Sequence, residues 1–126
     1  MMNTYDPLKA PDSEQWLELD PQERIALVEQ YHRKARVALP NRVLHATMHA
    51  VIENQLAEGI PVVCEALSRL MAEGLDRHDA VHAIASVMTE HIWHLLRKDP
   101  VGDDPNERYY QAVRALTAKQ WLESAP

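Results

Sequence analysis

Histidine is the residue type whose number and spacing most clearly suggest chemistry in this chain. The 126 residues include 7 histidines. Random placement would give roughly 0.6 pairs at separations of three or four, the spacings of neighbours on a helix. Three such pairs occur, namely His45/His49, His78/His82 and His91/His94. Because neutral imidazole is a common metal ligand, these helix faces predict a metal site.

The first pair continues to a carboxylate, as His45-x-x-x-His49-x-x-x-Glu53. Each four-residue step advances about 40° around a helix, so the three side chains follow one flank of an apolar stripe. His78 and His82 hold the same flank of a second apolar stripe. If the two helices are neighbours, the flanks converge on one divalent ion, with zinc, iron or manganese as candidates. The predicted ligands are His49, Glu53, His78 and His82, with His45 as a fifth ligand or a ligand of a second ion.

Two other interpretations of these histidines stay open. A histidine at the edge of a core often only donates to a backbone carbonyl or a carboxylate, and its role is then structural. Clustered histidines can also sense pH. Outside the pairs that converge, His32 and His94 are expected at the surface, and Asp79 is expected to support a helix start.

Motifs for established enzyme classes are missing from the sequence. It contains no phosphate-binding loop, dinucleotide-binding fingerprint or nucleophile elbow. The run His78-Asp79-Ala80-Val81-His82 differs from a zinc-protease motif by Asp for Glu, and the shorter carboxylate would reach a metal-bound water less well. The sequence therefore gives no catalytic residue and leaves open whether the protein is an enzyme.

The elements that must position the histidines are predicted to be helices. Gly is scarce, at 3 residues, and apolar residues recur with helical rather than alternating periodicity. Asp20, Asp76 and Asp104 are expected to cap helix starts. We predict an all-α fold with a single domain, residues 1–126, built as one compact bundle of about five helices after an irregular segment, residues 1–19. The expected helices are residues 21–39, 41–58, 61–73, 77–98 and 105–122.

Composition limits the function classes. The 13 basic and 19 acidic residues give a net charge of −6, which argues against nucleic acid and anionic membranes as partners. A single cysteine, Cys64, excludes an intramolecular disulfide and a cysteine-rich zinc site. No apolar run approaches the roughly 18 residues of a membrane span, and no signal peptide is recognisable at the start. A cytoplasmic protein is predicted, while a homo-oligomer stays open and no protein partner is indicated.

Several runs of the sequence resemble a small bacterial family of helical domains of unknown function. They are H-A-T-M-H-A-V-I-E-N-Q-L-A at 45–57, R-L-M-A-E-G-L-D-R-H-D-A-V-H-A-I at 69–84, Y-D-P-L at 5–8 and W-L-E-L-D-P-Q-E-R-I at 16–25. The resemblance covers about residues 5–97. It implies a helical fold and no known activity, so no site residue follows from it.

A looser similarity is to metal-dependent phosphohydrolases with a His-Asp doublet. His49, His78-Asp79 and a later Asp99 or Asp103 occur in that order, but the doublet opens a helix and lacks the usual apolar and Gly-Lys surroundings. The leading hypothesis is a helical bundle that binds a divalent metal. The alternatives are a non-enzymatic interaction or assembly domain with structural histidines, and a metal-dependent hydrolase with an open coordination position beside Asp79 or Glu53.

Overall fold

The computed structural model describes residues 2–34, 42–98 and 104–124. These ranges form seven helices and no strand, which confirms the all-α prediction and corrects the expected number of about five helices. The helices are α1 (Ser13–Glu18), α2 (Pro21–Lys34), α3 (Arg42–Ala57), α4 (Pro61–Ala72), α5 (Arg77–Leu96), α6 (Pro105–Ala115) and α7 (Ala118–Ser124). The expected helix limits at residues 39 and 41, together with Asp99 and Asp103, lie outside the described residues.

The two additional helices are short. One of them, α1, lies inside the segment that was expected to be irregular. The other, α7, exists because the expected helix 105–122 breaks at Leu116, whose backbone is extended. The Arg69 guanidinium of α4 donates to the carbonyls of Leu116 and Val113. A side chain from another helix thus donates to carbonyls at the point where the helix is interrupted.

The predicted helix caps are confirmed. The Asp20 carboxylate accepts from the backbone N–H of Glu23 at 2.8 Å, and the Glu23 carboxylate accepts in return from the Asp20 N–H. Asp76 accepts from the N–H of Asp79, and Asp104 caps α6. Each carboxylate satisfies an N–H that has no partner within its helix, so these starts are set locally.

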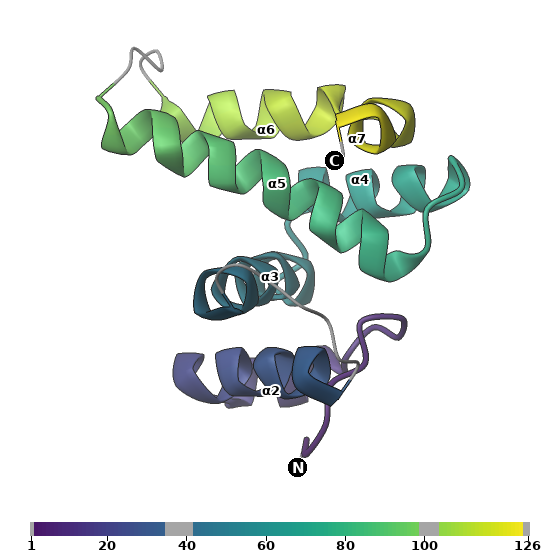
Figure 1. The fold of residues 1–126 in the computed structure, drawn as a ribbon, viewed down its shortest axis with the longest axis vertical. Coiled ribbons are helices and arrows are strands. Elements are labelled where there is room, and N and C mark those ends of the chain that lie inside the picture. Colours follow the sequence, from purple (N-terminus) through teal and green to yellow (C-terminus); the bar gives the residue numbers. More distant parts are fainter. Residues whose placement is uncertain (1, 35–41, 99–103, 125–126) are drawn as a thin grey trace.

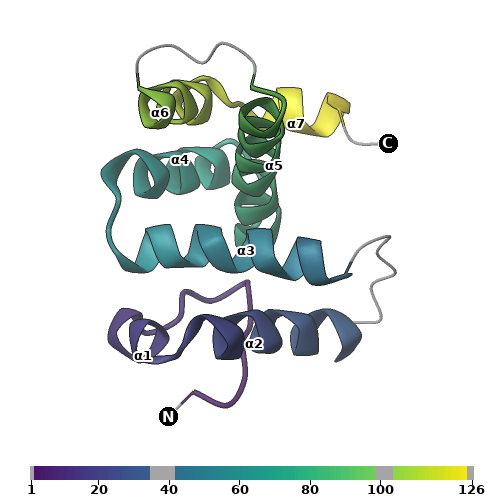
Figure 2. The same ribbon diagram turned by 90° about the vertical axis from the view of Figure 1, so that its left-hand side faces the viewer.

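Helix α3 occupies the middle of the molecule. Figures 1 and 2 show α1 and α2 on one side of α3, with α4 and α5 on the other and α6 and α7 beyond them. The larger core cluster joins α3 to the helices that follow it and includes the fully buried Ile52, Leu70, Ile84 and Val113. The smaller cluster joins α3 to the N-terminal segment and α2. Because both clusters meet at α3, its polar residues lie between two apolar cores.

Trp16 anchors the smaller cluster. Its side chain is fully buried, and its indole N–H donates to the Asn54 side-chain oxygen at 2.9 Å. The Asn54 oxygen also accepts from Arg24, so α1 and α2 are both tied to α3 by this one amide.

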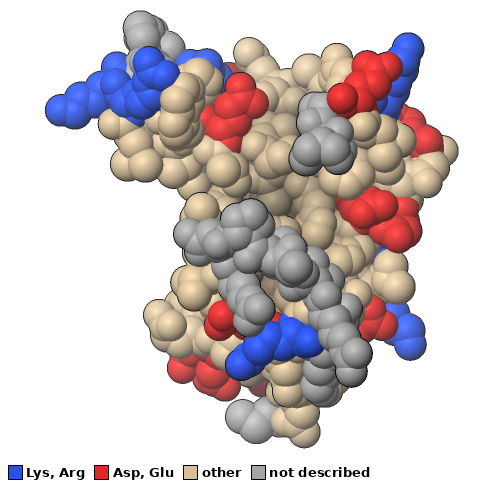
Figure 3. All heavy atoms as spheres, in the orientation of Figure 1, with Lys and Arg blue, Asp and Glu red and all other residues tan. Residues whose placement is uncertain are grey.

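On the face shown in Figure 3, the described acidic side chains lie in separate groups, and uncharged side chains cover most of the surface between them. Within the described residues, no helix combines the length and the apolar character that crossing a membrane requires.

Replacing Trp16 by Ala should destabilise the protein by about 3–5 kcal/mol, because a fully buried aromatic side chain leaves a cavity and loses its apolar contacts. The matched control is Trp93→Ala. Trp93 is 50 % exposed, with the Arg97 guanidinium 4.3 Å from its ring centroid and the His94 ring edge-on at a centroid distance of 5.3 Å, so its loss should cost less than about 1 kcal/mol. Urea unfolding followed by circular dichroism measures both values, and equal losses would contradict this account of the smaller core.

Candidate metal centre

Five histidines from three helices form one cluster. His32 comes from α2, His45 and His49 from α3, and His78 and His82 from the first two turns of α5. The ring centroids of neighbouring members are 4.2 to 6.2 Å apart. The His49 and His82 centroids are separated by 5.1 Å. The two flanks that the sequence placed on separate helices therefore meet in the fold.

Four members of the cluster have the spacing that a single ion needs. One nitrogen from each of His32, His49, His78 and His82 lies within 4.8 Å of the others. Tetrahedral zinc with nitrogen ligands at 2.0–2.1 Å separates those nitrogens by about 3.3 Å. Small side-chain rotations that shorten the nitrogen–nitrogen distances by at most about 1.5 Å would give the tetrahedral arrangement. We call these residues the four-histidine site.

Three nitrogens of this site are buried without a hydrogen-bond partner among the described residues. They are His32 Nε2, His49 Nδ1 and His78 Nε2. A buried polar atom without a partner costs about 1–3 kcal/mol, and such atoms are rare in folded proteins. Three such atoms lie on rings of one cluster, which therefore holds imidazole nitrogens that no described residue satisfies.

The tautomer of His32 follows from its backbone contact. Its Nδ1 lies 2.9 Å from the Val28 carbonyl oxygen. A carbonyl only accepts, so Nδ1 carries the proton and Nε2 of the neutral ring keeps its lone pair. His45 Nε2 and His82 Nε2 lie 3.0 Å apart. One of these two nitrogens donates to the other, which places His45 beside the four-histidine site.

Burial disfavours the charged form of four of the clustered imidazoles. Removal from water, followed by repulsion from neighbouring imidazoles, lowers the pKa of His82 to about 3 and that of His45 to about 4. The same causes lower the pKa of His49, and burial leads the lowering of the pKa of His78. Neutral imidazole is the form that coordinates a metal, so these rings are ready to bind at neutral pH.

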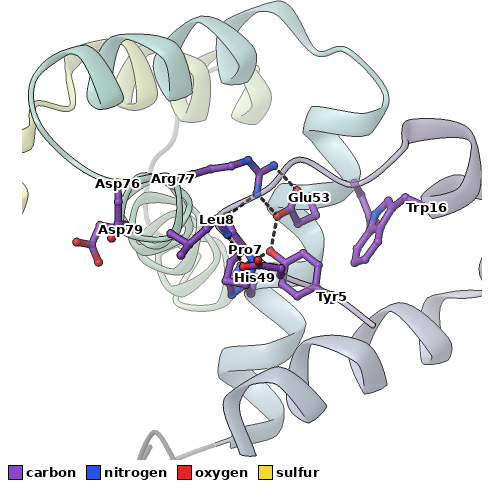
Figure 4. A network of polar contacts seen from close by, with 11 residues as sticks. Tyr5, Pro7, Leu8, Trp16, His49, Glu53, Asp76, Arg77 and Asp79 are labelled. Atoms are coloured by element: carbon purple, nitrogen blue, oxygen red, sulfur yellow. Dashed lines mark hydrogen bonds and ion pairs between the residues drawn. The ribbon is translucent and has the colours of Figure 1, made fainter. Parts of the chain in front are cut away.

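Glu53 lies in this region but does not contact an imidazole directly. Its carboxylate accepts two hydrogen bonds from the Arg77 guanidinium, at 2.7 and 2.8 Å (Figure 4). It also accepts from the Tyr5 hydroxyl. Arg77 donates further to the Pro7 carbonyl at 2.9 Å. The carboxylate that the sequence placed among the metal ligands is thus engaged in a buried ion pair.

Tyr5 connects this ion pair to the histidines. Its hydroxyl lies 2.7 Å from His49 Nε2, and its side chain is buried between Trp16 and His49. Figure 4 shows the hydroxyl between Glu53 and His49, whereas Asp76 and Asp79 lie apart at the start of α5. Through Tyr5, the N-terminal segment therefore links the Glu53–Arg77 ion pair to His49 by continuous hydrogen bonds.

Sequence reasoning missed three residues of this region. His32 was expected at the surface, but it is 4 % exposed. Its position four residues after the fully buried Val28 puts it on the inner face of α2, and that spacing was a usable signal. Tyr5 and Arg77 carried no such signal, because their partners lie 24 to 70 positions away in the chain.

A comparison with protein families finds a match over most of the chain. The model of a family described as a domain of unknown function (DUF1841) matches residues 11–115. All five clustered histidines, Glu53 and Arg77 fall inside the matched range, whereas Tyr5 precedes it. No curated protein and no solved structure matches the chain. The family match confirms the resemblance to helical domains of unknown function.

Replacing one partner of the buried ion pair should lower the free energy of unfolding more than expected from replacing both partners together. Glu53→Leu or Arg77→Met alone should destabilise the protein by about 3–5 kcal/mol, since each leaves an uncompensated buried charge. The double variant should lose less than the sum of the two single variants. Arg114→Met is the control, because Arg114 pairs with Glu107 at the surface and its loss should cost less than about 1 kcal/mol. Additive losses from urea unfolding would count against coupling.

The metal-free protein should lose stability as the pH falls from about 6.5 towards 4. The ordinary histidine pKa is 6.5, whereas those of folded His45 and His82 are about 4 and about 3. Above 6.5 both states are neutral; below it only the unfolded chain takes up protons, which favours unfolding. In the presence of a chelator, the urea concentration at the unfolding midpoint should decrease when the pH is lowered from 7 to 5.5. The decrease should be smaller for a His45→Gln/His82→Gln variant. A pH-independent midpoint over this interval would refute the prediction.

Proposed function

The chain belongs to the DUF1841 family, whose function is unknown, and we propose that it binds a divalent transition-metal ion in the four-histidine site. The observation that carries the proposal is that three imidazole nitrogens, each on a different ring of this cluster, are buried without a hydrogen-bond partner among the described residues. A bound cation would give each lone pair a partner and remove the desolvation penalty. Protein stability and metal affinity would then be linked.

The alternative of purely structural histidines fits these contacts less well. A structural imidazole is expected to use its polar atoms on backbone or side-chain partners. His32 does so with Nδ1 and His49 with Nε2, but each leaves its second nitrogen without a partner. Packing alone gives no reason to collect such atoms at one point in the interior.

The donor set favours zinc, with iron as the runner-up. All four ligand atoms are imidazole nitrogens, which suit zinc, copper, nickel and iron, whereas manganese and magnesium favour oxygen. Because Glu53 is engaged by Arg77 and Tyr5, the site offers no carboxylate oxygen from the residue that was expected to supply it. Asp6, Asp76 and Asp79 are close enough to His78 to raise its pKa against the effect of burial. Their negative charge favours a cation.

A metal-dependent hydrolase has less support than binding. It would need a carboxylate positioned to take a proton from a metal-bound water. Glu53 already accepts three hydrogen bonds, and Asp79 lies at the outer start of α5 (Figure 4). We therefore propose metal binding, and assign no reaction to the site.

Purified wild-type protein, dialysed against zinc and then against metal-free buffer, should retain about one equivalent of zinc per chain. His49→Ala and His78→Ala should each lose it, because each removes a ligand from a set of four. His91→Ala is the matched control: His91 lies on α5 but packs against Tyr109, with ring centroids 5.7 Å apart, outside the cluster. Elemental analysis and competition with a chromogenic chelator measure content and affinity.

The visible absorption spectrum of the cobalt-substituted protein reports the coordination geometry of the bound ion. Four nitrogen ligands in a tetrahedron should give the intense visible absorption of tetrahedral cobalt, which an octahedral adduct on surface histidines would not. A wild-type protein that takes up neither zinc nor cobalt, or alanine variants that keep full zinc content, would refute the proposed function.

A further inference from the structure

We infer that Tyr5 is a positioning residue that fixes which nitrogen of His49 faces the four-histidine site. The inference rests on the proposed function, since it names the residue that prepares one ligand of that site. The number of protons on the Tyr5 hydroxyl limits the hydrogen bonds that it can donate. The Tyr5 hydroxyl has one proton but two close partners, the Glu53 carboxylate and His49 Nε2.

The Arg77 guanidinium decides where the hydroxyl proton goes. Two hydrogen bonds from Arg77 join its permanent positive charge to the Glu53 carboxylate in a buried ion pair. An ionised carboxylate only accepts, so the Tyr5 hydroxyl donates to Glu53. The Tyr5 oxygen must then accept at its other contact, the one 2.7 Å from His49.

That acceptor role fixes the His49 tautomer. His49 Nε2 carries the proton and donates to Tyr5, so Nδ1 of the neutral ring keeps the lone pair. His49 Nδ1 is the nitrogen that is buried without a partner in the cluster. The chain of hydrogen bonds from Arg77 through Glu53 and Tyr5 therefore prepares Nδ1 of His49 as the metal ligand. A carboxylate that acts through such a partner also raises ligand basicity.

Burial protects this arrangement from water. Tyr5 is 5 % exposed, Glu53 1 % and Arg77 6 %. Burial and the adjacent Glu53 charge raise the pKa of Tyr5 well above its usual range, which keeps the hydroxyl protonated and able to donate.

A merely structural Tyr5 would behave differently. Its ring also packs on Trp16 and Tyr31, at centroid distances of 5.6 and 6.3 Å. If packing were its whole role, Tyr5→Phe would keep the ring contacts and alter neither the His49 tautomer nor the metal affinity. The His49 tautomer is thus the readout that separates the two roles.

The first experiment records long-range nitrogen–proton spectra of the histidines in metal-free wild-type protein. His49 should show the Nε2–H tautomer. His32 should show Nδ1–H, held by the Val28 carbonyl, and serves as an internal reference. In Tyr5→Phe, His49 should lose its strong Nε2–H preference while His32 keeps its own. A His49 Nδ1–H form in the wild type would overturn the inference even if the variant fails to fold.

The second experiment measures zinc affinity. Tyr5→Phe should weaken zinc binding by about 10- to 100-fold, the usual effect of losing a partner that orients a ligand. Tyr31→Phe is the matched control, because the Tyr31 ring contacts His32 and His78 edge-on at 5.4 Å but no described hydrogen bond joins its hydroxyl to an imidazole. It should change affinity by less than about 2-fold.

The two proposals fail in different ways. Equal zinc affinity in the wild type and Tyr5→Phe would overturn the role of Tyr5 and leave the metal site standing. A wild-type protein that binds no zinc would refute the metal site, while the metal-free spectra would still decide how Tyr5 orients His49.

Discussion

The ion pair between Arg77 and Glu53 is the constraint on which the rest of this structure depends. Two opposite charges in a protein interior are tolerated only when they meet with good geometry and their remaining hydrogen-bond groups are satisfied. Here the pair is bidentate, and the other partners come from Pro7 and Tyr5. Arg77 opens α5 and Glu53 lies in the last turns of α3, so the pair fixes how these two helices lie against each other.

That register brings the histidines together. Glu53 lies one turn after His49 on the same side of α3, and Arg77 directly precedes His78 on α5. Holding Glu53 to Arg77 therefore brings the flank of α3 that carries His49 against the first turns of α5. The same pair draws in the N-terminal segment, whose Tyr5 separates the carboxylate from the imidazole. One electrostatic contact thus sets the positions of elements from three parts of the chain.

Around α3, contributions that stabilise the fold lie beside contributions that oppose folding. The apolar clusters on either side of it stabilise the fold by burial, whereas the histidines between them leave polar atoms without partners. Apolar side chains at these positions would suit stability better, because an unpartnered buried nitrogen opposes folding. A metal ion in the proposed site would offset this penalty, because each unpartnered nitrogen would then have a partner.

The sequence by itself determined the features that depend on near neighbours: the capped helix starts at Asp20, Asp76 and Asp104, and the shared flank of His45, His49 and Glu53. These follow from hydrogen bonds within one turn and from the period of 3.6 residues. The break at Leu116, the inward position of His32 and the pairing of Arg77 with Glu53 depend on contacts between segments that are distant in the chain. The physical reason is that a carboxylate on a helix flank serves a metal or a guanidinium equally well, and packing between distant segments determines which one lies beside it.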